Sequence, residues 1–246
     1  MFLEDIKKKL PAPFKDFLKY LYSWPRTIGR PKIFCISMQR NGTTSVGVFL
    51  KDHGYKVASY GAHSKHWSSL WYKGDYERIF HSLKFKSFQA YEDNPWWFPD
   101  FYRVLNYRFP NAKFILMYRD SNKWFDSMIN HTSIRKLINN YEHNKIYRKL
   151  DLFYEKCDND PSFQPNKYDN ANCISFDDKR EHYIKVYEEY NREVVEYFKR
   201  YAPNKLFVSQ LTDKEKWKNL SQFLQIKVAT DYEVHANKTQ KKETVS

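Results

Sequence analysis

The run Lys32-Ile33-Phe34-Cys35-Ile36 is followed directly by Ser37-Met38-Gln39-Arg40-Asn41-Gly42-Thr43-Thr44-Ser45. The first five residues are a compact apolar run, typical of a buried parallel strand, and the residues from Thr44 to Leu50 read as the first turns of a helix. A strand, a loop with glycine and a helix direct free backbone N–H groups and the positive helix end at one point, where an anion can bind. Three hydroxyls add donors, and Arg40 adds a fixed charge. The stretch therefore predicts a phosphate-binding loop; the alternative is an ordinary strand-to-helix turn.

This loop departs from the nucleotide-hydrolase loop G-x-x-x-x-G-K-[ST]. Thr43 follows the glycine, Ser37 holds the position of the first glycine, and the basic residue is Arg40. The lysine on which γ-phosphoryl transfer relies is therefore missing from the motif. An ATP-dependent kinase or hydrolase stays open as an alternative, because Asp120 at a strand end could hold magnesium.

A second anion-binding element is predicted around Arg119. Lys113–Tyr118 is another buried-strand run, and Asp120 or Ser121 can cap a helix that extends past Ser127. Arg119 then lies at the carboxyl edge of a strand, where open α/β sheets bind ligands. A guanidinium and a hydroxyl that converge there could clamp a second phosphate; the alternative is a surface arginine paired with Asp120.

Both stretches resemble motifs of sulfotransferases that use 3′-phosphoadenosine 5′-phosphosulfate (PAPS). Residues 40–45 are similar to their 5′-phosphosulfate loop, commonly [KR]-x-G-T-T-S, and residues 118–127 are close to their R-D-x-x-x-W-x-x-S motif. Glu92-Asp93-Asn94-Pro95-Trp96, Trp217–Leu224 and His235-Ala236-Asn237-Lys238 agree, so the similarity runs in order from about Lys32 to Lys238. The resemblance implies a PAPS-dependent transferase whose donor contacts are Gln39, Arg40, Asn41, Gly42, Thr43, Thr44, Ser45, Arg119 and Ser127.

The chemistry of sulfuryl transfer assigns further roles. Arg40 and the loop N–H groups are expected to stabilise the charge that grows on the leaving phosphate, and the scheme requires no metal. Asp93 is our candidate for the general base, because it follows a predicted strand and precedes Pro95 and Trp96. Burial beside tryptophans would raise its pKa, which suits a base. Alternatively, Asp93 caps a helix near Pro99 or pairs with Arg119.

The sequence gives less direct evidence for the residues that contact the acceptor. His63 and His66, after the second predicted strand, are the second candidates for the base and are predicted to contact the acceptor. Trp96 is predicted to line the acceptor pocket, with a place in the core as the alternative. Tyr187 and Tyr190 are interpreted as packing residues. No pattern names the acceptor, which is a glycan, a lipid or a small molecule with a hydroxyl or an amine.

Five apolar runs read as strands, at residues 32–37, 55–58, 87–91, 113–118 and 205–209. The predicted helices lie between them, at residues 44–53, 67–83, 98–109, 121–154, 178–201 and 213–224, the last with the capping box Thr212-x-x-Glu215. Strands that alternate with helices predict an α/β fold with a parallel sheet covered on both faces. The resemblance implies its P-loop NTPase-like three-layer form, with a sheet of about five strands.

We divide the chain into three parts: an amphipathic helical segment at 1–30 packed on the body, a sulfotransferase domain at 31–238, and a frayed basic tail at 239–246. Residues 157–176 are polar and are expected to form a long loop. No apolar run approaches the roughly 20 residues that span a bilayer, and charges interrupt the N-terminal apolar stretch. We therefore expect a cytoplasmic protein, with peripheral membrane contact as a weaker alternative.

The chain has 42 Lys and Arg against 29 Asp and Glu, a formal net charge of +13. Such a charge favours polyanionic ligands, so a non-catalytic polyanion binder is a further alternative. The basic residues are scattered, and no specific nucleic-acid partner is predicted. The cysteines Cys35, Cys157 and Cys173 fit neither a metal site nor a disulfide framework, and a bond between the last two is left open.

Overall fold

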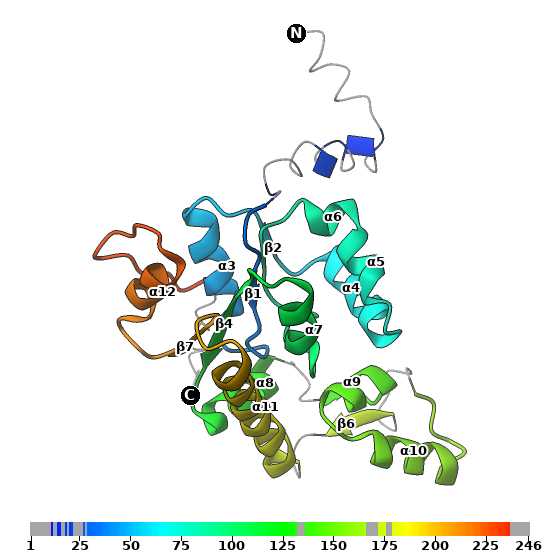
Figure 1. Cartoon of the computed structure of the whole chain (residues 1–246). Coiled ribbons are helices and arrows are strands. Elements are labelled where there is room, and N and C mark those ends of the chain that lie inside the picture. Colours follow the sequence, from blue (N-terminus) through cyan, green and yellow to red (C-terminus); the bar gives the residue numbers. More distant parts are fainter. Residues whose placement is uncertain are drawn as a thin grey trace.

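A central parallel sheet organises the computed structural model of the protein (Figure 1). The structure describes residue 27 and residues 29–131, 136–165, 172–175 and 179–236, together with six residues between 11 and 21. The sheet has the order β2-β3-β1-β4-β7, and every pairing is parallel. Its strands are β1 (Ile33–Cys35), β2 (Val57–Ala58), β3 (Ala90–Tyr91), β4 (Lys113–Tyr118) and β7 (Leu206–Gln210).

Side-chain alternation along the strands creates two separate cores. Ile33 and Cys35 of β1 face one core, which holds the apolar residues of α3 (Thr43–Asp52) and α12 (Lys216–Leu224). Phe34 and Phe114 face the opposite core, rich in Trp, Tyr and Phe. Strand residues alternate between faces, so a sheet buried on both sides requires a helical layer on each. The predicted three-layer α/β fold and its five-stranded parallel sheet are confirmed.

The aromatic core is covered by the larger set of helices, which lie on the other side of the sheet from α3 and α12 (Figure 1). These helices are α4 (Ala62–Tyr72), α5 (Tyr76–His81), α6 (Leu83–Lys86), α7 (Phe101–Arg108), α8 (Ser121–His131) and α11 (Arg180–Tyr201). The predicted helix at 67–83 is therefore wrong as a single element. Gly74, with φ of 70°, separates α4 from α5, and the Ser82 side chain caps α6.

The long helix predicted at 121–154 is also wrong. Helix α8 ends at His131, and the chain continues through β5 (Lys136–Ile138), α9 (Tyr141–Ile146) and α10 (Leu150–Asn159). The Asn140 side chain accepts the His143 N–H at 2.9 Å and caps α9, and Arg148, with φ of 55°, separates α9 from α10. Strand β5 pairs antiparallel with β6 (Cys173–Ser175), so the stretch predicted as a loop contains a strand. Figure 1 shows α9, β6 and α10 together, beside the sheet.

The start of α12 differs from the predicted capping box. The helix begins at Lys216, and Asp213 Oδ1 accepts the Glu215 N–H at 2.8 Å, while Thr212 contacts the Gln210 side chain. The Asp213 side chain thus bonds the N-cap residue Glu215, and among the described residues no side-chain capping bond is formed at the start of α12.

Most of the N-terminal segment and the whole tail at 239–246 lie outside the described residues, as do Asn237 and Lys238. Tyr20 is described, and its ring lies 6.0 Å from that of Phe88. All three cysteines are free thiols. No helix among the described residues combines the length and the apolar character needed to cross a membrane.

Candidate active site

The loop between β1 and α3 turns at two residues with left-handed backbone. Arg40 has φ of 68°, and Gly42, which directly precedes α3, has φ of 75°. Glycine adopts this conformation without steric cost, and a Cβ on Gly42 would lie only 2.6 Å from Leu211 Cδ1. The first N–H groups of a helix have no intrahelical acceptor. The turn therefore leaves these donors at the positive end of α3, which favours an anion.

Side-chain donors hold the carbonyl oxygens of the loop. The bonds run from Tyr190 Oη to the Ile36 carbonyl (2.7 Å), from Asn41 Nδ2 to the Met38 carbonyl (3.0 Å) and from Trp124 Nε1 to the Gln39 carbonyl (2.9 Å). The Gln39 side chain donates in turn to the Tyr147 hydroxyl at 2.6 Å. Because these carbonyls are bonded to the protein, the arrangement favours N–H groups on the open side of the loop.

Arg40 and Arg119 both lie at the carboxyl edge of the sheet, close enough for the charge of Arg119 to act on Arg40. Arg40 Nε–H donates to Ser127 Oγ of α8 at 3.2 Å. Burial and the positive charge of Arg119 both lower the pKa of Arg40. In the part of the chain that the structure describes, neither guanidinium forms a salt bridge with an acidic side chain. Two neighbouring cations without a carboxylate favour an anionic ligand between them.

The Tyr187 hydroxyl of α11 joins the two predicted motifs. It donates to Asn41 Oδ1 at 2.9 Å and accepts the Arg119 N–H at 3.0 Å. The loop after β1 and the end of β4 are thus both hydrogen-bonded to one oxygen atom, that of the Tyr187 hydroxyl. The predicted meeting of the two stretches at one sheet edge is present in the structure.

A pair of carboxyl groups follows β3. Asp93 is half-buried with φ of 69°, and the Asn94 N–H donates to its Oδ1 at 2.7 Å. Glu92 is 2 % exposed, and burial, reinforced by the charge of Asp93, raises its pKa to about 7. Burial, with smaller effects of both carboxylates, also raises the pKa of Cys35 to about 12. The acidic pair therefore lies near the end of β1, where the chain enters the loop before α3.

A family model named "Sulfotransferase domain" matches residues 32–242, most of the chain. This chain belongs to the sulfotransferase family. Among solved structures, a sulfotransferase from Alicyclobacillus acidocaldarius is similar, with 15% sequence identity and a TM-score of 0.46; the match covers 87% of this chain and 88% of that chain. No curated protein matches the sequence.

The other predicted donor contacts of the sulfotransferase lie at the start of α3. Thr44 is exposed, whereas Thr43 and Ser45 are buried. The Ser45 hydroxyl accepts the Ala236 N–H at 3.2 Å, so the C-terminal segment reaches the first turn of this helix. The Asn41 side chain is completely buried, and it acts on the shape of the loop.

The predicted acceptor contacts of the sulfotransferase are spread over different environments. His66 is exposed on α4, whereas His63 is half-buried, and burial and Lys84 lower its pKa. Trp96 is completely buried, with its ring 4.8 Å from that of Tyr91 and stacked on Phe101. In this arrangement the ring of Trp96 belongs to the aromatic core.

The sequence did not predict which buried side chains form hydrogen bonds with the loop. Tyr187 and Tyr190 do pack, but their hydroxyls also bond the loop and Arg119. Trp124 is part of the quoted motif, yet its N–H contact with the loop was not predicted. The available signal was two tyrosines three residues apart on one helix face, a pattern that does not specify their partners.

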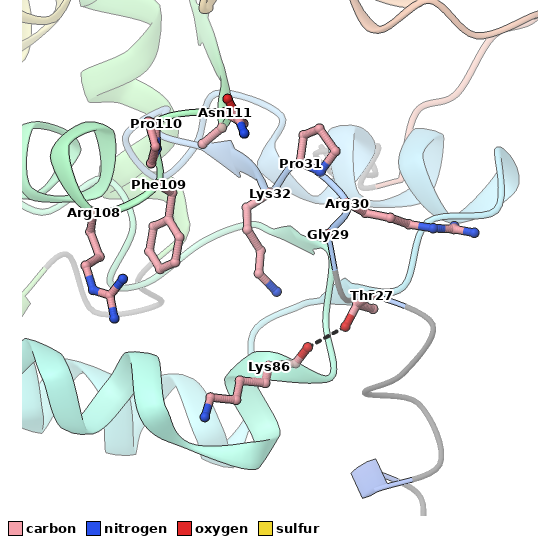
Figure 2. A pocket seen from close by; sticks show the side chains of 11 residues that line it. Thr27, Gly29, Arg30, Pro31, Lys32, Lys86, Arg108, Phe109, Pro110 and Asn111 are labelled. Carbon is pink, nitrogen blue, oxygen red and sulfur yellow. Dashed lines mark hydrogen bonds between the residues drawn. The ribbon is translucent and has the colours of Figure 1, made fainter.

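A cavity of about 300 Å³ lies at the opposite, amino edge of the sheet (Figure 2). Two of its basic lining residues are already engaged: Lys32 donates to the Phe88 carbonyl, and Arg108 pairs with Glu77. Arg30 extends away from Lys32 in Figure 2. This cavity is separate from the candidate active site. Within the described ranges, no group of three or more His, Cys, Asp or Glu side chains is placed to hold a metal ion.

Proposed function

We propose that this sulfotransferase transfers a sulfuryl group from PAPS to a hydroxyl or an amine of an acceptor by in-line displacement. Two arginines at one sheet edge carry the proposal: Arg40 and Arg119 lie next to the N-terminus of α3, and neither has an acidic partner among the residues that the structure describes. Such a site suits a ligand with two separate anionic groups. Gln39, Asn41, Gly42, Thr43, Thr44 and Ser45 would form the loop around the 5′-phosphosulfate with Arg40, while Arg119 and Ser127 would hold the 3′-phosphate.

Bound PAPS would supply the sulfuryl group and a stable leaving group, 3′,5′-adenosine bisphosphate. The acceptor oxygen or nitrogen forms a bond to sulfur while the bond between sulfur and the phosphate oxygen breaks. Asp93 takes the proton of the acceptor, and the electron pair of the broken bond stays on the phosphate. Arg40 and the loop N–H groups stabilise this developing charge, an effect that is strongest when donors are fixed in advance.

Asp93 suits the base because it is half-buried at the strand end that faces the loop region. His63 is the second candidate, and its lowered pKa keeps the imidazole neutral. We assign acceptor contact to His63 and His66 on α4, and a supporting position behind the acceptor site to Trp96. The acceptor itself is assigned only by chemistry, as a glycan, a lipid or a small molecule.

The contacts of Asp120 argue against the alternative function, an ATP-dependent kinase or hydrolase. Asp120, its candidate magnesium ligand, accepts the Lys123 N–H at 2.9 Å and caps α8. The basic residue of the loop is Arg40, and Thr43 stands after Gly42 where the nucleotide-hydrolase motif has lysine.

Calorimetry with 3′,5′-adenosine bisphosphate tests the proposal. We expect binding without magnesium, and we expect Arg40→Ala and Arg119→Ala to weaken it by about 10- to 100-fold, as for lost hydrogen bonds to charged groups. Arg192→Ala is the matched control, because Arg192 is exposed on α11 and pairs only loosely with Glu196. Failure of the wild-type protein to bind the bisphosphate, or tighter binding of ATP that requires magnesium, would contradict the proposal. A screen of acceptors with radiolabelled donor then identifies the second substrate.

A further inference from the structure

We infer that Tyr187 is a positioning residue that couples the two phosphate-binding motifs, so that a ligand with both phosphates binds better than its two halves would predict. The inference rests on the proposed function, since it concerns how the same site recognises the donor nucleotide. Tyr187 belongs to α11, outside both motifs, and its hydroxyl contacts both of them.

The hydroxyl makes its contacts with defined polarity. It accepts the Arg119 N–H at 3.0 Å, and it has carbonyl acceptors at Asn41 Oδ1 (2.9 Å) and at the Arg119 backbone (3.2 Å). A tyrosine hydroxyl has a single proton, so the shorter contact to Asn41 is the better one. Burial is the main cause that raises the pKa of Tyr187, and the hydroxyl therefore keeps its proton at physiological pH.

Asn41 is oriented to receive this bond. Its Nδ2–H donates to the Met38 carbonyl at 3.0 Å, which turns Oδ1 toward Tyr187. The Asn41 side chain is completely buried and spans the interior of the loop. A displacement of the Tyr187 hydroxyl is thus transmitted to the backbone on both sides of Arg40.

The ring of Tyr187 is held as firmly as its hydroxyl. It stacks on Trp124 with centroids 4.3 Å apart and an interplanar angle of 13°. Trp124 itself donates to the Gln39 carbonyl at 2.9 Å. Tyr187 is 2 % exposed. One stacked pair therefore links the start of the loop, the middle of the loop and the end of β4.

This geometry fixes the distance between the two proposed phosphate-binding sites, at Arg40 and at Arg119, before a ligand binds. Fixing two sites relative to each other lowers the entropy lost when one ligand contacts both. A ligand with a single phosphate gains little from the fixed distance. The hydroxyl of Tyr187 should therefore matter more for the bisphosphate than for a monophosphate.

The test measures affinity for 3′,5′-adenosine bisphosphate and for adenosine 5′-monophosphate in the wild-type protein and in Tyr187→Phe. We expect the variant to bind the bisphosphate about 10-fold more weakly and the monophosphate less than about 3-fold more weakly, because the loss falls on preorganisation. A purely structural role would reduce both affinities by the same factor. Amide hydrogen exchange at Arg119 should accelerate in the variant, because that N–H loses its acceptor.

Tyr190→Phe is the matched control, since it removes one hydroxyl from the same helix and one bond to the loop, at Ile36, without contact to Arg119. It should leave the ratio of the two affinities unchanged. If Tyr187→Phe leaves this ratio unchanged while the wild-type protein binds the bisphosphate, the inference is wrong and the proposed function stands. If the wild-type protein does not bind the bisphosphate, both are wrong. Urea unfolding of each variant, together with the exchange rate at Arg119, separates a local change from a global loss of structure.

Discussion

Glu92 is a buried carboxyl that packs against helix α3. A Cβ on Gly47 of α3 would lie 3.0 Å from Glu92 Cγ, so the helix and this side chain are in close contact. One carboxylate oxygen, Oε2, is buried without a hydrogen-bond partner among the described residues. Burial of an ionised carboxylate is costly, and the group responds by holding its proton, with a pKa raised to about 7.

Glu92→Gln should make stability less sensitive to pH. The pKa of Glu92 rises from 4.5 to about 7 on folding. The folded state therefore keeps a proton that the unfolded state loses, and the contribution is full below about pH 4.5 and is lost as pH rises to about 7. Relative to wild type, the glutamine variant should gain on the order of 2–3 kcal/mol between pH 4.5 and pH 8. Urea unfolding at both pH values measures this gain, and an equal pH dependence in the two proteins would contradict the assignment.

The neighbouring Asp93 has a different predicted effect. Asp93→Asn keeps the shape of the side chain but removes its ability to accept a proton. Turnover on an identified acceptor should fall by about 10²- to 10⁴-fold, as for a lost general base. The affinity for 3′,5′-adenosine bisphosphate should stay within about 3-fold of wild type, because the base contacts the acceptor. Wild-type turnover of the variant would transfer the role to His63, whose substitution is then the next test.

At the scale of elements, the turn into α3 allows a comparison between two glycines. Gly42 and Gly54 have φ of 75° and 83°, but only a Cβ on Gly42 meets another atom, Leu211 Cδ1. Alanine in left-handed backbone costs about 1–2 kcal/mol, so both alanine variants should lose about that much unfolding free energy. Only Gly42→Ala should also lose affinity for the bisphosphate, because only that turn aims N–H groups at the ligand. Calorimetry on both variants decides; equal affinities would mean that the turn at Gly42 does not shape the site.

The elements also separate what the sequence predicts from what it does not. All five sheet strands were predictable from short apolar runs. The inner runs are buried on both faces, as expected for a parallel sheet, whereas in the edge strand β7 Val208 and Gln210 are exposed. The motif around Arg119 was predictable because the residue follows such a strand. The antiparallel pairing of β5 with β6 was not, because α9 and α10 separate the two short strands in sequence. The hydrogen bond between Tyr187 and Asn41 was not predictable for the same reason, since the two residues are 146 positions apart in the sequence.

At the scale of the whole molecule, the parallel sheet brings distant segments to one edge. The strand order places β1 between β3 and β4, so the loop after β1 lies between Asp93 and Arg119. The proposed base and the proposed phosphate-binding arginine thus lie on opposite sides of the loop, which would align the two substrates of the proposed transfer. Basic residues elsewhere in the chain raise the net charge to +13. This charge attracts an anionic ligand before the ligand contacts the site.

This overall charge predicts that the bisphosphate binds faster at low ionic strength. Charges act over about 30 Å at 0.01 M salt and about 10 Å at 0.1 M, and attraction by a protein of opposite charge raises association rates. Stopped-flow measurements should show the association rate constant falling about 10-fold between about 0.02 M and 0.3 M NaCl. Arg119→Ala should keep most of this salt dependence, because its net charge is still 13 − 1 = +12, although its affinity is lower. Uncharged adenosine is the control and should associate at a rate independent of salt. A salt-independent rate for the bisphosphate would contradict electrostatic attraction of the ligand by the protein.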